Sequence, residues 1–569
     1  MLATRIYGSL VEVTPTDCPD AKEIKKITLK CNEPFSFQIA YKWEDGQKDS
    51  MPVYVRINSD LKVNYYYTAC VPVMHANFTN LAEKRNIGLY PDVLMPKKRN
   101  PEIKCIKAPH DQYFIEKGEE TLLMAYDDSW QSLWFCVNED SISQKSGKYN
   151  LEIEFYSGLT QELLAKRNIE VELLETKLLP QKLYYTNWFH YDCLADAHRV
   201  ELFSEEYFEI MSDYLKKASR NGMNMLLLPA FTPPLDTPIG EERMTVQLVS
   251  IKYENKKYSF DFSLMKKFID IAKKSGIKYF EHSHLFSQWG AEATPKIMVT
   301  VNGKEKHLFG WHTDAKSPKY KNFLKQYLTA LREFLKGEKL VGKVLFHVSD
   351  EPENKFLENY VSALSTVEEF FEGYMHSDAL WDYSFYEKGI LKSPIVSTGG
   401  IDKFIGKCDN LWAYYTGNEI AENMSNRTIL NTRCRNRILG IMLYYYGIKG
   451  FLHWGYNFYY GIMSQGRYDP RLNPCGCSGK AGTSFSVYPS DDGTALQSVR
   501  QKVFFDGILD MRNLELLEKL TDKSNCKALI EKYFGVPNFK TTSATPEIFD
   551  NFINELNLQI RKSIKETSK

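Results

Sequence analysis

Short apolar runs alternate with long amphipathic segments from about residue 180 to residue 520, and this alternation constrains the fold more than any other feature. Between Ser204 and Gly222, apolar side chains return at three- and four-residue steps, which predicts a helix, and the apolar run 223–229 that follows predicts a short strand. The pattern repeats with a helix from Asp261 before strand 277–283 and a helix from Pro318 before strand 343–349. Repeated strand–helix units favour a parallel sheet.

The number of predicted strands decides which kind of parallel sheet forms. We expect strands at residues 183–189, 223–229, 277–283, 343–349, 373–379, 393–397, 410–415 and 450–456. Eight strands predict a (β/α)8 barrel of the TIM type, although segment 427–433 competes for one of the later places. The region exceeds the roughly 250 residues typical of this fold, so it must contain insertions. One insertion is a hairpin around Asn302-Gly303, which forms either part of a wall or lid or a surface decoration.

Residues 1–179 have a different pattern. Short runs rich in Val, Ile, Tyr and Phe, such as 35–41 and 149–155, are separated by clusters of turn-forming residues with almost no helical period. This predicts a β-sandwich. The tail 521–569 contains one or two polar helices, one of them near 546–562. Because 569 residues exceed what one core organises, we expect a multidomain β and α/β protein, with a β-sandwich at 1–179, a barrel at 180–520 and a helical tail at 521–569.

The composition excludes some classes of partner. Lys plus Arg and Asp plus Glu both number 72, so the chain lacks the basic field that binds nucleic acid. No run of 18 apolar residues occurs, so we expect no membrane span. Residues 1–12 lack the pattern of a signal peptide, which favours a cytoplasmic protein, or a secreted or periplasmic one if a signal has been removed. Composition leaves the oligomeric state undetermined.

Cysteines and aromatic residues are both numerous. The eleven Cys residues include one closely spaced pair, Cys475 and Cys477, without a nearby His, so we expect free thiols and no metal site. Aromatic residues reach 14%, which suits either a tyrosine-rich core or a sugar-binding surface.

Two adjacent acids, Asp350 and Glu351, follow the predicted strand 343–349 and precede Pro352. Acidic doublets are common in this chain, so the doublet alone is weak evidence. Its position is more informative, because barrel enzymes place catalytic groups at the C-terminal ends of strands. The alternative is that the acids cap the next helix, with Pro352 at its first position.

Adjacent strand residues point to opposite faces, so two successive acids can act on one substrate only where the strand ends and the backbone turns. Cleavage of a glycosidic bond needs one carboxylic acid to protonate the leaving oxygen and negative charge to stabilise the oxocarbenium-like centre. If Asp350 stays ionised beside Glu351, repulsion raises the pKa of Glu351 and keeps it protonated. Two successive acids at such a turn therefore suit the chemistry of a glycoside hydrolase.

At these residues the sequence resembles glycoside hydrolase family 123, a family of β-N-acetylgalactosaminidases with an N-terminal β-sandwich and a (β/α)8 barrel. Asp350-Glu351-Pro352 matches the Asp-Glu-Pro of the family. Further similar blocks, in the same order over about residues 183–520, are Arg437-Ile438-Leu439-Gly440, Tyr446-Gly447-Ile448, Gly450-Phe451-Leu452-His453-Trp454-Gly455-Tyr456-Asn457 and Val487-Tyr488-Pro489 with Gly493. Cys475-Gly476-Cys477 has no counterpart that we can match, so the rim of the pocket and the sugar preference can differ.

The resemblance implies substrate-assisted catalysis, in which the acetamido group of the substrate is the nucleophile and forms an oxazoline-type intermediate. It implies that Glu351 is the general acid and then the base, and that Asp350 orients the acetamido nitrogen. The configuration is retained, and no cofactor or metal is implied. The implied substrate is a glycan or glycolipid with a terminal N-acetylhexosamine.

Side chains at the strand ends are the candidates for holding the sugar. In the last matched strand, Trp454 is placed against the acetamido methyl group. The full set of predicted substrate-binding residues is Trp454, Tyr456, Asn457, Tyr414, Tyr415, Tyr383, Asp378, Trp188 and His282, with Trp289 and Trp311 in nearby loops. For each aromatic residue the alternative is core packing. For the whole protein the alternatives are a glycosidase for another 2-acetamido sugar such as N-acetylglucosamine, or a catalytically silent glycan-binding protein.

Overall fold

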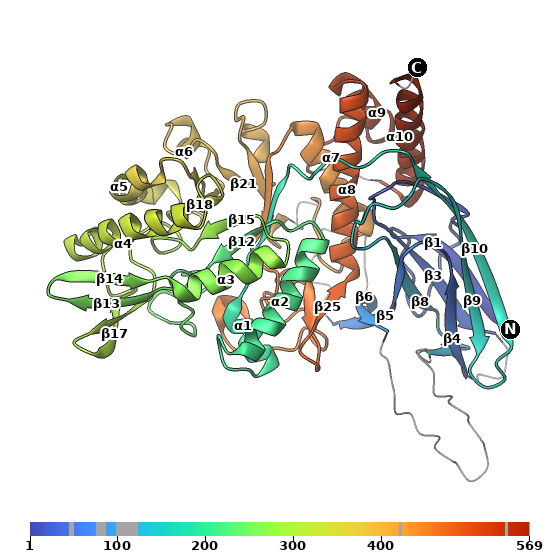
Figure 1. Cartoon of the computed structure of the whole chain (residues 1–569), viewed down its shortest axis with the longest axis horizontal. Coiled ribbons are helices and arrows are strands. Elements are labelled where there is room, and N and C mark those ends of the chain that lie inside the picture. Colours follow the sequence, from blue (N-terminus) through green and yellow to red (C-terminus); the bar gives the residue numbers. More distant parts are fainter. Residues whose placement is uncertain (45–49, 75–86, 98–122, 420–423, 541–543, 568–569) are drawn as a thin grey trace, which may run out of the picture.

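The computed structural model describes residues 1–44, 50–74, 87–97, 123–419, 424–540 and 544–567. Figure 1 shows a β-rich region at the N-terminal end, drawn in blue and teal, beside a larger α/β region. The prediction of a β-rich region followed by an α/β region is therefore confirmed.

The N-terminal region consists of two sheets that pack face to face. The first contains β1 (Leu2–Gly8), β3 (Phe35–Trp43), β8 (Gln131–Val137), β5 (Val63–Val73) and β6 (Gly88–Pro96), in that order. The second contains β2 (Lys26–Lys30), β10 (Leu163–Leu174), β9 (Gly147–Ser157), β4 (Ser50–Asn58) and β7 (Leu123–Tyr126). Alternate side chains from both sheets, such as Phe37, Phe135 and Ile153, form one buried core between them.

The α/β region is built on one parallel sheet. Its strands, in spatial order, are β19 (Met375–His376), β18 (Val344–Phe346), β15 (Tyr279–His282), β12 (Met225–Leu228), β11 (Tyr184–Asn187), β23 (Gly450–His453), β22 (Trp412–Tyr414), β21 (Ile395–Ser397) and β20 (Ala379–Leu380). The first and last strands of this order, β19 and β20, are separated in the chain only by Ser377 and Asp378. The sheet therefore curls until its two edges come close together.

Each of the eight predicted strand segments contains an observed strand, and the fifth is interrupted to give β19 and β20. Segment 427–433 forms no strand, because α7 (Arg433–Tyr446) begins at its end, so it does not compete for a place. The helices after the early strands are α1 (Tyr191–His198) and α2 (Glu205–Arg220), then α3 (Ser263–Lys274), α4 (Pro318–Gly337) and α5 (Leu357–Val367). After the fifth and sixth strands only α6 (Ser384–Glu387) and a 3-10 turn (Ile401–Lys403) intervene, so the strand–helix alternation is irregular there.

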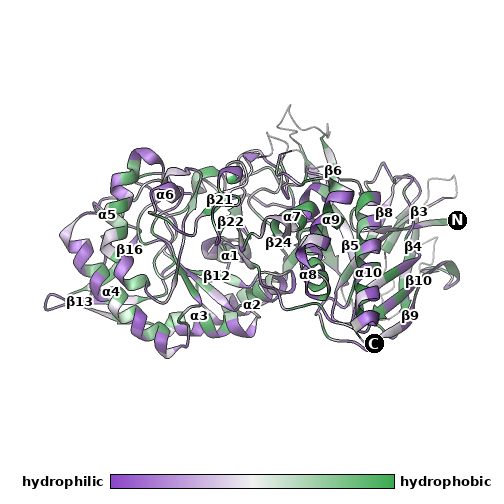
Figure 2. Ribbon diagram, turned by 90° about the horizontal axis from the view of Figure 1, so that it is seen from above, coloured by the Kyte–Doolittle hydropathy of each residue, from purple (hydrophilic) through white to green (hydrophobic). Residues whose placement is uncertain are grey.

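Helices α3 and α4 each bury one stripe of apolar residues. In α4, Tyr320, Leu324, Tyr327 and Leu331 return at three- and four-residue steps and are buried. Hydrophobic and hydrophilic residues alternate along α3 and α4 in Figure 2, as expected for helices that cover a sheet.

The predicted insertion is present. β16 (Ile297–Val301) and β17 (Lys304–Phe309) form an antiparallel hairpin in which Asn302 and Gly303 both have positive φ, as its two-residue turn requires. A second hairpin, β13 (Ser250–Glu254) and β14 (Lys257–Asp261), was not predicted and joins the first in a four-stranded sheet. This small sheet extends from the body of the α/β region (Figure 1).

The two regions share a sheet. β24 (Val487–Pro489) and β25 (Ala495–Ser498) extend the first N-terminal sheet through pairing of β25 with β6. The buried ion pairs Arg500–Asp92 (2.9 Å) and Lys502–Glu139 (2.6 Å) then attach α8 (Val499–Leu520) to the N-terminal region. Sequence periodicity did not predict this return of the chain. α9 (Lys523–Phe534) and α10 (Pro546–Thr567) complete the C-terminal part.

Candidate active site

The backbone turns sharply at Glu351, five residues beyond the end of β18. Glu351 has φ +43°, a left-handed conformation that costs a non-glycine residue about 1–3 kcal/mol. Glu351 N donates to the Ala379 carbonyl (3.1 Å), and Trp289 N donates to the Asp350 carbonyl (2.7 Å). These bonds hold a turn that takes the two acids out of the alternation of the strand.

The doublet does not cap the next helix. The following 3-10 turn, Asn354–Phe356, has Glu353 at its N-cap position, and no side chain makes a capping hydrogen bond there. The alternative interpretation of the doublet as a helix cap is therefore wrong.

Two side chains from neighbouring strand ends fix the carboxylate of Glu351. Tyr414, on β22, donates its hydroxyl proton to Glu351 Oε1. Trp381, which directly follows β20, donates from Nε1 to the same oxygen at 3.2 Å. The Tyr414 side chain is buried, whereas Trp381 is 44% exposed, so a ligand can reach the indole ring.

The electrostatic coupling of the two acids has a direction that the sequence did not predict. Burial raises the pKa of Asp350 well above its usual range, and the charge of Glu351 raises it further. The sequence predicts that an ionised Asp350 raises the pKa of Glu351. In the structure the group that is driven toward its neutral form is Asp350, because burial has the largest effect on its pKa.

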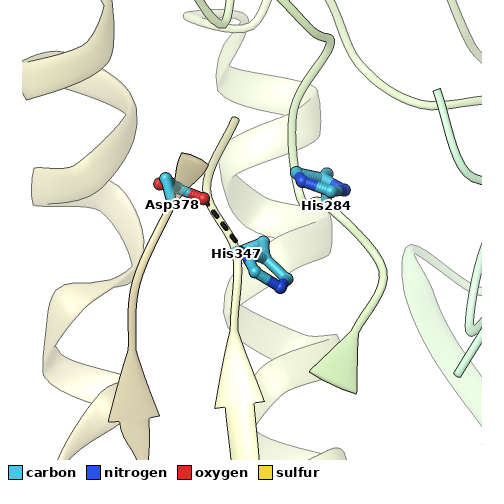
Figure 3. Close-up of side chains that lie close together, drawn as sticks. All are labelled: His284, His347 and Asp378. Carbon is cyan, nitrogen blue, oxygen red and sulfur yellow. Dashed lines mark ion pairs between the residues drawn. The ribbon is translucent and has the colours of Figure 1, made fainter. Parts of the chain in front are cut away.

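A buried polar cluster lies behind the doublet, at the ends of β15, β18 and β19. His347 Nε2 contacts Glu281 Oε2 at 3.0 Å, and His347 Nδ1 lies 3.4 Å from Asp378 Oδ1 (Figure 3). Burial alone would lower the pKa of His347, but its contacts with Asp378 and Glu281 outweigh burial and raise the pKa to about 10. A protonated imidazole therefore bridges two buried carboxylates.

Asp378 also supports the backbone that leads to the doublet. Its carboxylate accepts from Val348 N at 2.9 and 3.2 Å and from the Tyr360 hydroxyl at 2.6 Å. Burial alone would raise the pKa of Asp378, but the bonds from His347 and His376 outweigh it and lower the pKa to about 2. Asp378 is fully buried, so it positions strand β18 rather than contacting a sugar, which corrects the role predicted for it.

The comparison with known protein families decides which class of enzyme carries this arrangement. Residues 188–517, more than half of the chain, match the family described as "Glycoside hydrolase 123, catalytic domain". The chain belongs to glycoside hydrolase family 123. This confirms the resemblance noted in the sequence and makes the protein a glycoside hydrolase.

Solved structures agree at the level of the fold. A family 123 glycoside hydrolase from Clostridium perfringens, solved in a study of glycolipid glycan hydrolysis, has a TM-score of 0.69 at 15% identity. The alignment covers 100% of this family 123 chain and 98% of the other. Bacteroides uniformis β-glucuronidase 2 aligns with 86% of this chain and 48% of its own, at 10% identity and a TM-score of 0.30, which is too low to support an argument. No curated protein matches. Within the described residues, no helix has the length and apolarity needed to cross a membrane.

The other predicted substrate-binding residues of this family 123 enzyme fall into three groups, and the first group borders the interior of the curled sheet. Trp188 is buried and donates from Nε1 to Glu281 Oε2 at 3.0 Å, so it holds the polar cluster rather than the sugar. Trp454 is partly exposed and packs against the cluster of apolar residues that includes Trp188 and Tyr414. Of these residues, Trp454 keeps a surface that a ligand can contact.

The second group faces the outer layer, which corrects the prediction for its members. Tyr415 packs on Phe451, and His282 bonds to the Tyr327 hydroxyl at 2.7 Å. Tyr456 donates to the Tyr214 carbonyl at 3.0 Å. His282 and Tyr415 each follow an inward-facing residue, Glu281 or Tyr414, by one position, so their side chains point to the other face of the sheet. Tyr456 lies beyond β23, where the alternation of the strand has ended.

Two more predicted residues have structural contacts. Asn457 is fully buried and bonds to both the N–H and the carbonyl of His190, at 2.8 and 3.0 Å, so it fixes a loop. Tyr383 packs edge-on against Phe404, with Lys407 over its ring. Within the described residues, neither forms a hydrogen bond with Asp350 or Glu351.

Sequence reasoning missed Trp381, Glu281 and His347. The rule that strand ends carry functional groups could have found Trp381, because it follows β20 directly.

Cys475 and Cys477 are buried beside Tyr459 and Phe485. A Cβ on Gly476 would lie 2.3 Å from the Tyr468 ring, so only glycine fits between the two cysteines.

Proposed function

We propose that this enzyme is a retaining exo-β-N-acetylgalactosaminidase that removes terminal N-acetylgalactosamine from glycan or glycolipid chains. The observation that carries the proposal is the turn at Glu351, which frees two successive carboxyls from strand alternation while Tyr414 and Trp381 orient one of them. The glycolipid glycans in the study of the Clostridium perfringens relative support this class of substrate.

We also propose that the curled sheet is a (β/α)8 barrel with two reduced crossovers, because its edge strands β19 and β20 are nearly consecutive.

In the first step, Glu351 is the general acid. Both donors to its carboxylate meet Oε1, which leaves Oε2 to carry the proton. That proton passes to the glycosidic oxygen as the bond from C1 to this oxygen breaks. The acetamido carbonyl oxygen of the substrate forms the new bond to C1, and Asp350 takes the proton of the acetamido nitrogen, so a neutral oxazoline results.

In the second step, Glu351 is a base. It removes a proton from water, the water oxygen bonds to C1 on the face that the aglycone left, and the oxazoline opens. Asp350 returns its proton to the nitrogen. Each carboxyl therefore ends the cycle in its starting state, and two displacements at C1 retain the configuration.

Asp350 must lose its own proton before it can act as this base, and its raised pKa then strengthens the carboxylate that results. A carboxylate with a higher pKa is a stronger base, so it withdraws the amide proton more effectively as positive charge develops on the acetamido group. We place Trp454 against the acetamido methyl group, because it is partly exposed beside Tyr414.

The test compares nitrophenyl β-glycosides of N-acetylgalactosamine and N-acetylglucosamine, which differ only at the 4-hydroxyl. Faster hydrolysis of the galacto epimer and inhibition by an N-acetylgalactosamine thiazoline support the proposal. Faster hydrolysis of the gluco epimer would instead assign the enzyme to the other 2-acetamido sugar. Binding of the thiazoline without turnover of either glycoside would indicate a silent glycan-binding protein.

A further inference from the structure

Three fully buried side chains at the ends of β15, β18 and β19 lie close together (Figure 3). One ligand atom from each of His284, His347 and Asp378 lies within 4.8 Å of the others. His347 Nδ1 and Asp378 Oδ1 are 3.4 Å apart, close to the separation of roughly 3.4 Å between two ligands of a tetrahedral zinc ion. The three ligand atoms would have to approach one another by at most roughly 1.4 Å to reach this separation throughout.

His284 is the unusual member of this group. Its exposed fraction is 0%, and within the described part of the chain neither ring nitrogen has a hydrogen-bond partner. A neutral imidazole carries one donor and one acceptor, and leaving a buried polar atom unpaired is unfavourable. The ring stacks on His347 with centroids 4.7 Å apart, and Trp188 contacts it edge-on at 5.3 Å. The fold therefore holds His284 in place while a nitrogen lacks a partner.

The surroundings of His347 match the outer shell of a metal site. Glu281 contacts Nε2 and so leaves Nδ1 for the ion, and Trp188 and Thr186 in turn donate to Glu281. A carboxylate behind a histidine in this way fixes the ring and strengthens it as a ligand. Asp378 Oδ1 accepts one backbone N–H at 2.9 Å and retains a lone pair for an ion.

We propose that His284, His347 and Asp378 bind one divalent transition-metal ion, of which zinc is the representative probe. Two imidazoles and one carboxylate are ligands typical of such ions. The two positive charges of the ion would neutralise the buried carboxylates of Glu281 and Asp378. The ion would connect three adjacent strand ends, and one of its ligands, His347, lies three residues before Asp350. It would therefore stiffen the support of the catalytic pair without taking part in the glycosidic reaction.

Two rival arrangements make different predictions. A proton on His347 can neutralise part of the same charge, in which case no metal binds. A surface group formed by His307, His312 and Glu242 can also collect zinc, since His307 Nδ1 lies 2.8 Å from Glu242 and the two imidazoles are 4.9 Å apart. The variant His312→Gln removes this exposed group and serves as the matched control.

The experiment uses the full chain, treated with a chelator, reloaded with zinc chloride and dialysed. Elemental analysis should give about one zinc per chain for the wild type and for His312→Gln, and at least about tenfold less for His284→Gln. Zinc should raise the midpoint of thermal unfolding of the wild type and of His312→Gln, but not that of His284→Gln. If His312→Gln retains no zinc and His284→Gln retains about one zinc per chain, the surface group binds the ion and the proposal is overturned.

A second measurement covers the case in which His284→Gln does not fold. Cobalt added to the metal-free wild type should give visible absorption bands of low-coordinate cobalt with nitrogen and oxygen ligands, and one equivalent of zinc should abolish them. Wild-type protein that retains no zinc and shows no such bands would overturn the proposal and leave the protonated His347 as the bridge. Neither result bears on which sugar is cleaved, so this proposal and the proposed function can fail independently.

Discussion

Trp381 Nε1 donates to Glu351 Oε1 at 3.2 Å. The residue directly after β20 therefore holds the acid that follows β18. The Tyr414 hydroxyl, from β22, approaches the same oxygen. One carboxylate oxygen is thus fixed by two elements far apart in the sequence, and the other is left for proton transfer.

Glu351→Gln should lower kcat by at least about 10²-fold, because an amide cannot deliver a proton to the glycosidic oxygen. The shape of the side chain is kept, so the thermal unfolding midpoint should stay close to that of the wild type. Nitrophenol release and a melting curve measure both. Wild-type rates in this variant would remove Glu351 from its proposed role.

Tyr414→Phe should lower kcat by about 10- to 100-fold, since a hydrogen bond to a charged group contributes about 1.5–3 kcal/mol. Tyr415→Phe is the matched control. It removes the neighbouring hydroxyl, which has no hydrogen-bond partner within the described residues and faces the outer layer, so its activity should be unchanged. Equal losses in the two variants would contradict the contact with Glu351.

Trp381→Phe keeps an aromatic ring but removes the donor to Glu351. We expect a loss of kcat of about tenfold, smaller than that of Tyr414→Phe because the bond is longer and more exposed. Steady-state kinetics decide this, and the control is Trp130→Phe in the N-terminal region, where the ring lies beside Arg5. A change in KM alone would mean that Trp381 contacts the sugar without orienting Glu351.

Asp350→Asn should abolish most activity and raise stability at neutral pH. Asp350 has a folded-state pKa above its unfolded value, so its ionisation destabilises the folded chain as the pH rises from about 4 through the folded pKa. The variant carries no charge there, so its gain in unfolding free energy should be present at pH 7 and vanish below about pH 4. Urea unfolding across pH tests this, and a variant less stable than the wild type at pH 7 would contradict it.

The same ionisation predicts the pH dependence of the reaction. Because the proposed base is the Asp350 carboxylate, kcat/KM should rise with pH along an acidic limb that lies well above the usual range of an aspartic acid. A limb centred near pH 4 would contradict a raised pKa for Asp350.

Lys502→Met should lower the free energy of unfolding by about 3–5 kcal/mol, because it leaves the buried Glu139 carboxylate unpaired between the two regions. Burial alone would raise the pKa of Glu139, but the charge and hydrogen bond of Lys502 outweigh it and hold the pKa below its usual range. The stabilisation of the folded chain by the Lys502–Glu139 ion pair is therefore present above about pH 4 and is lost as the pH falls. Lys26→Met, at an exposed pair with Glu170, should cost no more than about 1 kcal/mol.

Local features of the sequence determined much of this fold. The helical period of residues 204–222 and the turn chemistry of Asn302-Gly303 depend only on nearby residues, and both features occur where expected. The position of Asp350 and Glu351 after an apolar strand was likewise visible in the chain, as was the similarity to family 123.

Tertiary structure alone decided which strand-end side chains face inward. Tyr414 and Tyr415 are equivalent in the sequence, but one bonds to Glu351 and the other packs on Phe451, because successive residues of a strand point to opposite faces. The raised pKa of Asp350 depends on how deeply its carboxyl is buried, and the cluster of His284, His347 and Asp378 joins three separate strands. Burial and convergence of this kind arise between residues distant in the chain, so no local pattern could determine them.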